Sequence, residues 1–139
     1  MSRARGFSSR GWREHGAAAV EMAIVLPMLL LIVGGLVDLG RAYYTNLIIT
    51  NAAREGARMV AMGYTTAQAD NRITQAAIGL GGMTMTRSYS TCPSAGGNGT
   101  ATVTITNFSW LMLDVVPSFF GGSIPLPNLS ATGSMRCNG

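Results

Sequence analysis

A long apolar segment near the N-terminus dominates the pattern of hydrophobic and polar positions. Residues 17–37 contain one charged side chain, Glu21, and otherwise consist of apolar residues, glycine and one proline. As an α-helix this segment would be about 31 Å long, close to the roughly 30 Å hydrocarbon core of a bilayer. We therefore predict a transmembrane helix at residues 17–37. The alternative, a buried helix of a soluble protein, is disfavoured because so small a domain can hardly surround it.

Beyond the apolar segment the helical pattern continues, but polar side chains now recur along it. Residues 38–62 contain no proline, and their polar positions follow helical spacing. This pattern predicts an amphipathic extension of the same helix. Asp38 with Arg41, and Glu55 with Arg58, stand three positions apart, so the members of each pair can meet on one face.

A second, shorter helix is predicted next. Thr65 and Gln68 have the spacing of a capping box, and an apolar stripe follows them. We expect this helix to end at Gly79 or at Gly81-Gly82, because glycine favours helix C-termini. Residues 38–82 are thus expected to form the helical extension and the second helix.

From Met83 onwards the pattern changes to the two-residue period of β-strands. Small or polar side chains alternate with apolar ones in three segments that can form strands, residues 83–86, 100–106 and 129–135. The glycine-rich stretch 94–99 predicts a loop, and an apolar run at 110–116 precedes glycines and prolines. We expect residues 83–139 to form a small antiparallel sheet of three or four strands with one face covered by the long helix. The predicted fold class is α+β.

The N-terminal leader carries most of the positive charge. All ten cations are arginine, and four of them lie in the first fifteen residues against one acid, Glu14. Beyond Gly16 six arginines face five acids, a net charge of +1. We interpret residues 1–16 as a basic, disordered leader that stays in the cytoplasm, which places everything after Val37 on the other side of the membrane. An ordinary secretory signal is an alternative, although the apolar run exceeds the usual length of about 7–15 residues.

Cysteine usage agrees with this orientation. The two cysteines, Cys92 and Cys137, both lie on the side predicted to be oxidising. We expect an intramolecular disulfide, with two unpaired thiols or a bond between chains as alternatives. The bridge would close a loop of about 45 residues and stabilise the fold by ~4 kcal/mol on the chain-entropy model.

The sequence provides no active site. His15, the single histidine, lies in the leader, so a Ser-His-Asp or Cys-His arrangement cannot be built beyond the membrane segment. Two cysteines and one histidine do not give zinc-site spacing, and the glycine-rich stretches lack the strand–loop–helix context of a phosphate-binding loop. The part after the leader also lacks a basic, aromatic face for nucleic acid. We therefore expect no enzyme activity, metal, cofactor or nucleic-acid partner.

Glu21 is the one residue that the membrane prediction leaves unexplained. A carboxylate at the centre of a bilayer costs about 2.5–3.5 kcal/mol, and less at the depth of ~6 Å expected for Glu21. Cleavage between Gly16 and Ala17 would create an α-amino group that is largely protonated at neutral pH. Glu21 would then be the fifth residue of the mature chain and could pair with its own amine or with that of a neighbouring subunit. The alternative is that Glu21 simply reaches the headgroups.

These residues resemble a known family. Gly16, Glu21 at the fifth mature position, the basic leader and the apolar helix are similar to a type IV prepilin processing site. The longer match, strong over residues 16–62, is to the TadE-like family of minor pilins or pseudopilins of Tad (tight adherence) pili. It rests on four stretches, Ala17-Ala-Ala-Val-Glu21, Val25-Leu-Pro27, Asp38-Leu-Gly-Arg41 and Asn51-Ala-Ala-Arg-Glu-Gly-Ala-Arg58.

The resemblance implies a function. A prepilin peptidase would cut after Gly16, and Glu21 would help extract or align the subunit during assembly with other pilins of the apparatus. The protein would be a single-pass component of the bacterial inner membrane, either incorporated into a surface pilus or retained in the membrane as a helper. It would contribute to pilus assembly, adhesion or secretion. One departure stands out, because Met22 occupies a position where the family leads one to expect an aromatic residue.

Pro27 fits the same interpretation. In a helix interior proline frees a carbonyl group and can kink the helix, which would help a subunit adapt between bilayer and filament. Simple tolerance of proline in membrane helices is the alternative. For the whole chain, the alternative function is an unprocessed bitopic membrane protein whose exterior domain binds a ligand.

Overall fold

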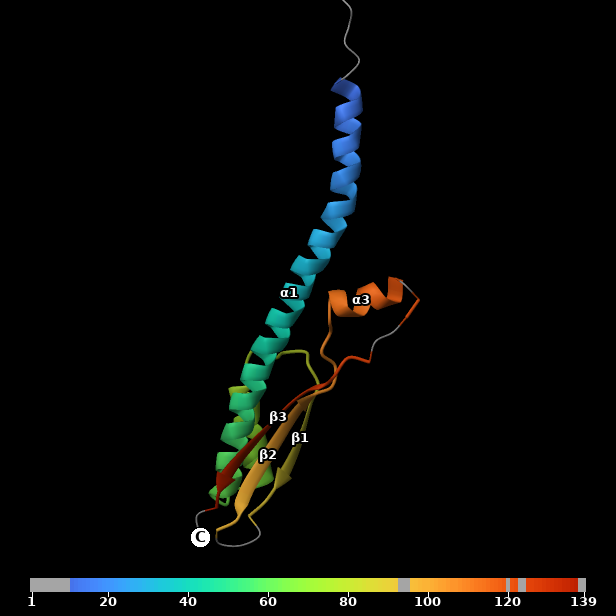
Figure 1. Cartoon of the computed structure of the whole chain (residues 1–139). Coiled ribbons are helices and arrows are strands. Elements are labelled where there is room, and N and C mark those ends of the chain that lie inside the picture. Colours follow the sequence, from blue (N-terminus) through green and yellow to red (C-terminus); the bar gives the residue numbers. More distant parts are fainter. Residues whose placement is uncertain (1–10, 93–95, 120, 123–124, 138–139) are drawn as a thin grey trace, which may run out of the picture.

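The computed structural model describes residues 11–92, 96–119, 121–122 and 125–137. Its helices and strands are, in chain order, α1 (Gly11–Ala61), α2 (Thr66–Ala76), β1 (Met85–Ser90), β2 (Asn98–Ile105), α3 (Met112–Phe119) and β3 (Leu129–Arg136). The N-terminal half of α1 stands away from the rest, whereas the sheet lies along its C-terminal half (Figure 1). The predicted α+β fold, with a long apolar helix, a short second helix and an antiparallel sheet, is confirmed.

The first helix runs through the predicted boundary between leader and membrane segment. It begins at Gly11, so residues 11–16 are helical where the sequence predicted disorder. Residues 1–10 lie outside the described part. Extending an existing helix costs little, because each added residue contributes one hydrogen bond without a new nucleation step. At the other end α1 stops at Ala61, and Gly63 makes the turn with a φ of +80°, a conformation that favours glycine.

The second helix begins as its capping box predicts. The Thr65 hydroxyl accepts from the Gln68 backbone N–H, and the Gln68 side chain accepts from the Thr65 N–H at 3.1 Å. The helix ends at Ala76, before the glycines at which the sequence placed its end. Its buried residue Ile73 packs into the core beneath α1.

The strands form one antiparallel sheet in the order β1-β2-β3. β2 alternates buried and half-buried positions over most of its length, as its sequence predicted. β1 lies at residues 85–90, so the predicted strand at 83–86 was placed too early. The apolar run at 110–116 adds no fourth strand, because residues 112–119 form α3 instead.

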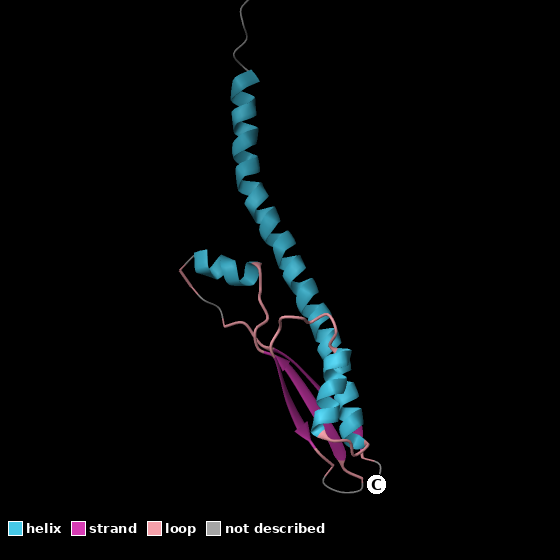
Figure 2. Ribbon diagram, turned by 180° about the vertical axis from the view of Figure 1, so that it is seen from behind, coloured by secondary structure: helices cyan, strands magenta, loops and turns pink. Residues whose placement is uncertain are grey.

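The core lies between the sheet and the C-terminal half of α1. Small side chains of α1 make close approach possible, and they pack with Ile73, Ala101, Val103 and Ile105. Gly133 of β3 sets the tightest contact, since a Cβ there would lie only 2.5 Å from the Ala53 carbonyl oxygen. The predicted packing of the helix on one sheet face is therefore confirmed. Seen from behind, α3 projects to the side of this packed region (Figure 2).

Candidate functional site

The N-terminal half of α1 presents an apolar surface on all sides. Its large side chains between Val20 and Val37 are 45% to 70% exposed, and none of its most apolar 18-residue window is buried. Among the described residues α1 is the single helix long and apolar enough to cross a membrane. This half of the helix needs an apolar environment that the chain itself does not supply.

Glu21 lies on this bare surface. Its side chain is exposed, and no hydrogen bond or ion pair joins it to any side chain that the structure describes. Gly16 and Ala17 are also exposed and lie inside α1, where Ala17 carries a peptide N–H rather than an α-amino group. The predicted ion pair of Glu21 therefore requires prior cleavage of the chain.

Pro27 lies within α1, and the helix continues on both sides of it. The helix is not straight in its N-terminal half (Figure 1). Because proline has no N–H, the carbonyl of Ala23 lacks its usual partner four residues on. The kink at Pro27 stays a prediction. The Ala23 carbonyl, which lacks its usual hydrogen-bond donor, is the feature that would support a kink.

Asp38 is the next carboxylate of α1 after Glu21, and its environment is the reverse of that of Glu21. Its side chain is completely buried at the point where the predicted membrane span ends. The two carboxylate oxygens accept hydrogen bonds from the backbone N–H groups of Leu111 at 2.8 Å, Met112 at 2.6 Å and Leu113 at 3.2 Å. These are the orphan donors at the start of α3, so Asp38 caps a helix more than seventy residues away in sequence.

The charge of Asp38 is stabilised by these contacts. Burial by itself raises the pKa of the carboxyl, but the three backbone N–H groups and the nearby Arg41 outweigh it and hold the pKa below its ordinary value of 3.8. The Arg41 guanidinium lies 4.0 Å from the carboxylate, as the spacing of the two residues predicted. It also lies 5.6 Å from the centre of the Phe108 ring, which itself packs edge-on against Trp110.

The sequence missed the principal role of Asp38. It predicted the local ion pair with Arg41 but no contact with residues 111–113. A carboxylate at the end of an apolar run is a signal that a distant partner must exist, yet nothing in the sequence indicates which one. The other predicted local pair, Glu55 with Arg58, does not form among the described contacts, because Glu55 lies 3.8 Å from Arg72 of α2.

Asp38 and Gly34 hold α3 against α1. Met112 packs over Gly34, where an added Cβ would collide with the Met112 side chain. A groove of about 210 Å³ runs between the two helices, lined by Leu31, Gly35, Met112, Leu113, Val116 and Pro117. The α3 helix thus contacts the last two turns of the predicted membrane span. Met112 covers Gly34, whereas no other atom lies within 4 Å of the position that a Cβ would take at Gly35.

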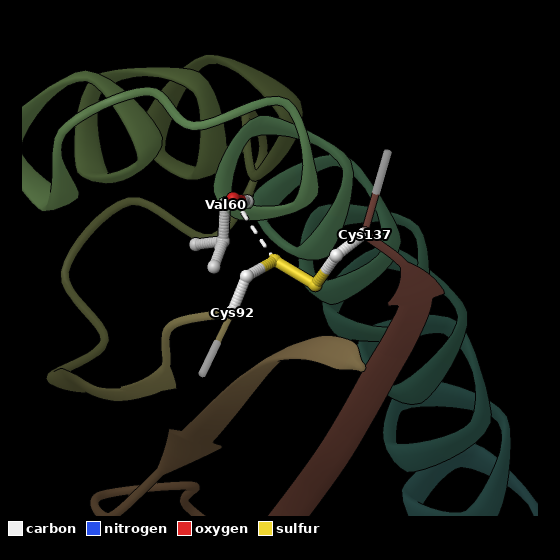
Figure 3. The surroundings of a disulfide bond; sticks show 3 residues. All are labelled: Val60, Cys92 and Cys137. Carbon is white, nitrogen blue, oxygen red and sulfur yellow. Dashed lines mark hydrogen bonds between the residues drawn. A yellow bond between two sulfur atoms is a disulfide. The ribbon is translucent and has the colours of Figure 1, made fainter. Parts of the chain in front are cut away.

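Cys92 and Cys137 come together at the far end of the sheet from α3. Their sulfurs lie at disulfide bonding distance within one chain, with a Cα–Cα distance of 6.0 Å (Figure 3). The Sγ of Cys92 also lies 3.8 Å from the Val60 carbonyl oxygen near the end of α1. The pair therefore joins the segment after β1 to the end of β3 beside the last turn of α1.

The remaining polar groups form a structural cluster beside α2. The Tyr89 hydroxyl donates to the Asp70 carboxylate, and Arg87 lies 3.8 Å from the same carboxylate. Burial and the neighbouring Asp70 raise the pKa of Tyr89 well above its ordinary range. Within the described residues no three His, Cys, Asp or Glu side chains gather into a metal-binding group. These contacts fix β1 to α2.

Comparison with known proteins identifies the N-terminal segment. No curated protein and no solved structure matches the chain significantly. Residues 16–58 match the family model described as TadE-like protein. This segment contains Gly16, Glu21, Pro27 and Asp38 and ends close to the end of α1. The predicted resemblance to the TadE-like family is thereby confirmed over residues 16–58, about a third of the chain.

Proposed function

We propose that the chain is a non-enzymatic minor pilin or pseudopilin of a Tad-type pilus. It is anchored in the bacterial inner membrane by residues 17–37, with its N-terminus in the cytoplasm and its sheet outside. The match of residues 16–58 to the TadE-like family supports a pilin-like protein associated with a Tad pilus. The bare apolar half of α1 is the structural observation that supports the proposal most strongly.

The exposed apolar side chains favour a subunit that exchanges lipid for other helices. Burying one large aliphatic side chain contributes about 1.5–3 kcal/mol, so this surface must be covered by lipid or protein. In the membrane the lipid tails cover it. In a filament the same surface packs against neighbouring subunits, and the open glycine Gly35 and the small residues 17–19 allow close approach. The packed sheet then decorates the helical rod and contributes to assembly, adhesion or secretion.

Processing after Gly16 precedes the transfer of the helix from lipid to the filament. The scissile bond between Gly16 and Ala17 lies in a helical segment, which must open before a prepilin peptidase can cut it. Glycine lowers the cost of opening, because it is less stable than alanine in a helix by ~1 kcal/mol. Cleavage removes the basic leader and gives Ala17 an α-amino group, with which Glu21 of the same or a neighbouring subunit pairs.

The mass of the protein recovered from membranes tests the processing step. We expect a mature chain that begins at Ala17. A Gly16→Val variant should keep its leader, whereas the matched Gly11→Ala variant, which lies five residues upstream in the same helix, should be cut normally. An intact leader on protein found in assembled filaments would contradict the proposal and favour the unprocessed bitopic protein with an exterior ligand-binding domain.

Glu21→Ala tests the role of the carboxylate in assembly. Leaving one charge of a buried pair without its partner costs several kcal/mol, which corresponds to at least about a tenfold loss of subunits in the filament fraction even at a shallow depth. Glu14→Gln is the control, because Glu14 is discarded with the leader and should have no effect. Equal incorporation of Glu21→Ala and the parent would overturn this role.

A further inference from the structure

The α3 helix lies at the level of the membrane boundary. Met112 packs on Gly34, and Leu31 and Gly35 line the groove between the two helices. All three residues of α1 belong to the predicted span at residues 17–37. Along a helix, Leu31 lies ~9 Å from Val37, the last residue of that span. Any bilayer that covers residues 17–37 therefore reaches the depth at which α3 contacts α1.

Large apolar side chains on α3 and just before it stay exposed beside its contact with α1. Leu111, the residue before the helix, is 51% exposed, Leu113, which also lines the groove, is 37% exposed, and Val115 is 57% exposed. The polar side chains of the helix, Asp114 and Ser118, are one turn apart and form a narrow stripe of their own. This distribution is typical of a helix that lies in a membrane interface with its apolar side in the acyl chains.

The orientation of α3 agrees with that placement. In both views α3 projects sideways from α1, away from the sheet (Figures 1 and 2). Its first turn needs no water, because the buried Asp38 carboxylate accepts from three of its backbone N–H groups. Arg41 and the ring of Trp110 lie beside this turn, and arginine and tryptophan favour the headgroup level of a bilayer.

We propose that α3 is an interfacial helix, held by Asp38 at the outer boundary of the bilayer and seated among the acyl chains through Leu111, Leu113 and Val115. The proposal rests on the membrane anchoring put forward above and adds a second lipid contact to it. The partner of this surface is the lipid itself, because the surface is continuous with the lipid-facing side of α1 through Leu31 and Gly35. The outer domain is then fixed in orientation relative to the membrane before assembly.

Lipid quenching in the full-length protein tests the proposal. The protein is reconstituted in vesicles of phosphatidylethanolamine and phosphatidylglycerol, and one added cysteine carries a fluorophore under non-reducing conditions that preserve the Cys92–Cys137 pair. Val115→Cys probes α3, Leu30→Cys probes the span, and Ser88→Cys probes the exposed side of β1. Nitroxide groups at shallow or deep acyl-chain positions report the depth of each probe.

The expected pattern separates the two proposals. Shallow nitroxide lipids should quench the Val115 probe several-fold more than the Ser88 probe, and deep ones should quench the Leu30 probe. Quenching at Leu30 without quenching at Val115 overturns the interfacial helix and leaves the membrane anchor intact. Absence of quenching at both positions overturns the anchor and the interfacial helix together.

Asp38→Asn in the same assay tests the positioning role of Asp38. Loss of the carboxylate should reduce quenching of the Val115 probe by shallow lipids and leave the Leu30 probe unchanged. Unchanged quenching at both positions would show that apolar contacts alone hold α3 in place, and it would overturn the role assigned to Asp38.

Discussion

The two halves of α1 form one continuous helix but differ in what surrounds them. Between residues 17 and 37 the surface is apolar on every side and exposed, so its partner must be another medium or another chain. Between residues 38 and 61 one stripe of mostly small residues is buried against α2 and the sheet, and the exposed side carries polar groups together with Leu39, Tyr43, Tyr44 and Leu47. The change occurs at Asp38, where the exposed apolar surface ends and the packed protein core begins.

Two of the carboxylates of α1, Glu21 and Asp38, show the same contrast at single residues. Glu21 is exposed and has no partner among the described side chains, whereas Asp38 is buried and accepts three backbone hydrogen bonds. An acid in an apolar environment is stable when it is paired or capped. Asp38 is satisfied within the folded chain, whereas for Glu21 we propose a partner that forms during processing or assembly.

Removing the cysteine pair should give the largest loss of stability, all of it in the C-terminal half. The two cysteines are 45 positions apart in sequence. A Cys92→Ser/Cys137→Ser double variant should lose up to ~4 kcal/mol of the free energy of unfolding of the sheet domain. Denaturant unfolding in detergent, with tyrosine exposure as the signal, measures this loss. Retention of parent stability by the double variant would show that the bridge constrains the unfolded chain little.

Asp38→Ala should follow, with an expected loss of about 3 kcal/mol, because it leaves buried N–H groups without an acceptor. The effect should be concentrated in α3. Hydrogen exchange of the Leu111, Met112 and Leu113 amides should become much faster, while exchange in β2 changes little. Uniformly faster exchange across the sheet would instead mean that Asp38 supports the whole domain.

Gly133→Ala tests the close contact between β3 and α1. Its Cβ would lie 2.5 Å from the Ala53 carbonyl oxygen and 2.8 Å from the Arg54 nitrogen, both in the backbone, so the strand must shift. We expect a loss of about 1–3 kcal/mol in thermal or denaturant unfolding. Gly35→Ala is the matched control in the other half, since nothing lies within 4 Å of its Cβ and alanine favours the helix. Similar losses in both variants would contradict the division of α1 into a packed and an unpacked half.

The contribution of Asp38 to the free energy of unfolding should decrease at acidic pH. Because the pKa of folded Asp38 lies below its ordinary value of 3.8, its stabilisation is fully present above that value and is lost as the pH falls through the folded pKa. The stability difference between the parent and Asp38→Asn should therefore be constant near neutral pH and shrink below about pH 4. A difference that grows on acidification would contradict the assignment.

Glu21→Ala should have the smallest effect on stability. The side chain makes no described contact, so the free energy of unfolding of the sheet domain should change by less than ~0.5 kcal/mol. Unfolding curves of the variant and the parent should superimpose. A clear loss would mean that Glu21 serves the fold and that its proposed role in assembly is secondary.

Local patterns in the sequence determined much of this protein. The apolar run at residues 17–37, the amphipathic extension, the capping box at Thr65 and the alternation in residues 100–105 each indicate their element, because each depends on neighbours in sequence. The apolar run and its amphipathic extension, within residues 16–62, also carried the resemblance to the TadE-like family. Boundaries were less accurate, since the start of α1 and of β1 depends on hydrogen bonds that extend an element beyond its clearest pattern.

Tertiary structure decided the features that join distant segments. Residues 110–116 are apolar almost throughout, and such a run can be strand or helix; the Asp38 carboxylate favours helix by accepting from three successive N–H groups. Glu55 pairs with Arg72 and not with the predicted Arg58, because α2 packs beside Glu55. A carboxylate in an apolar helix shows by itself that a partner is needed, but only the folded chain determines which partner it meets.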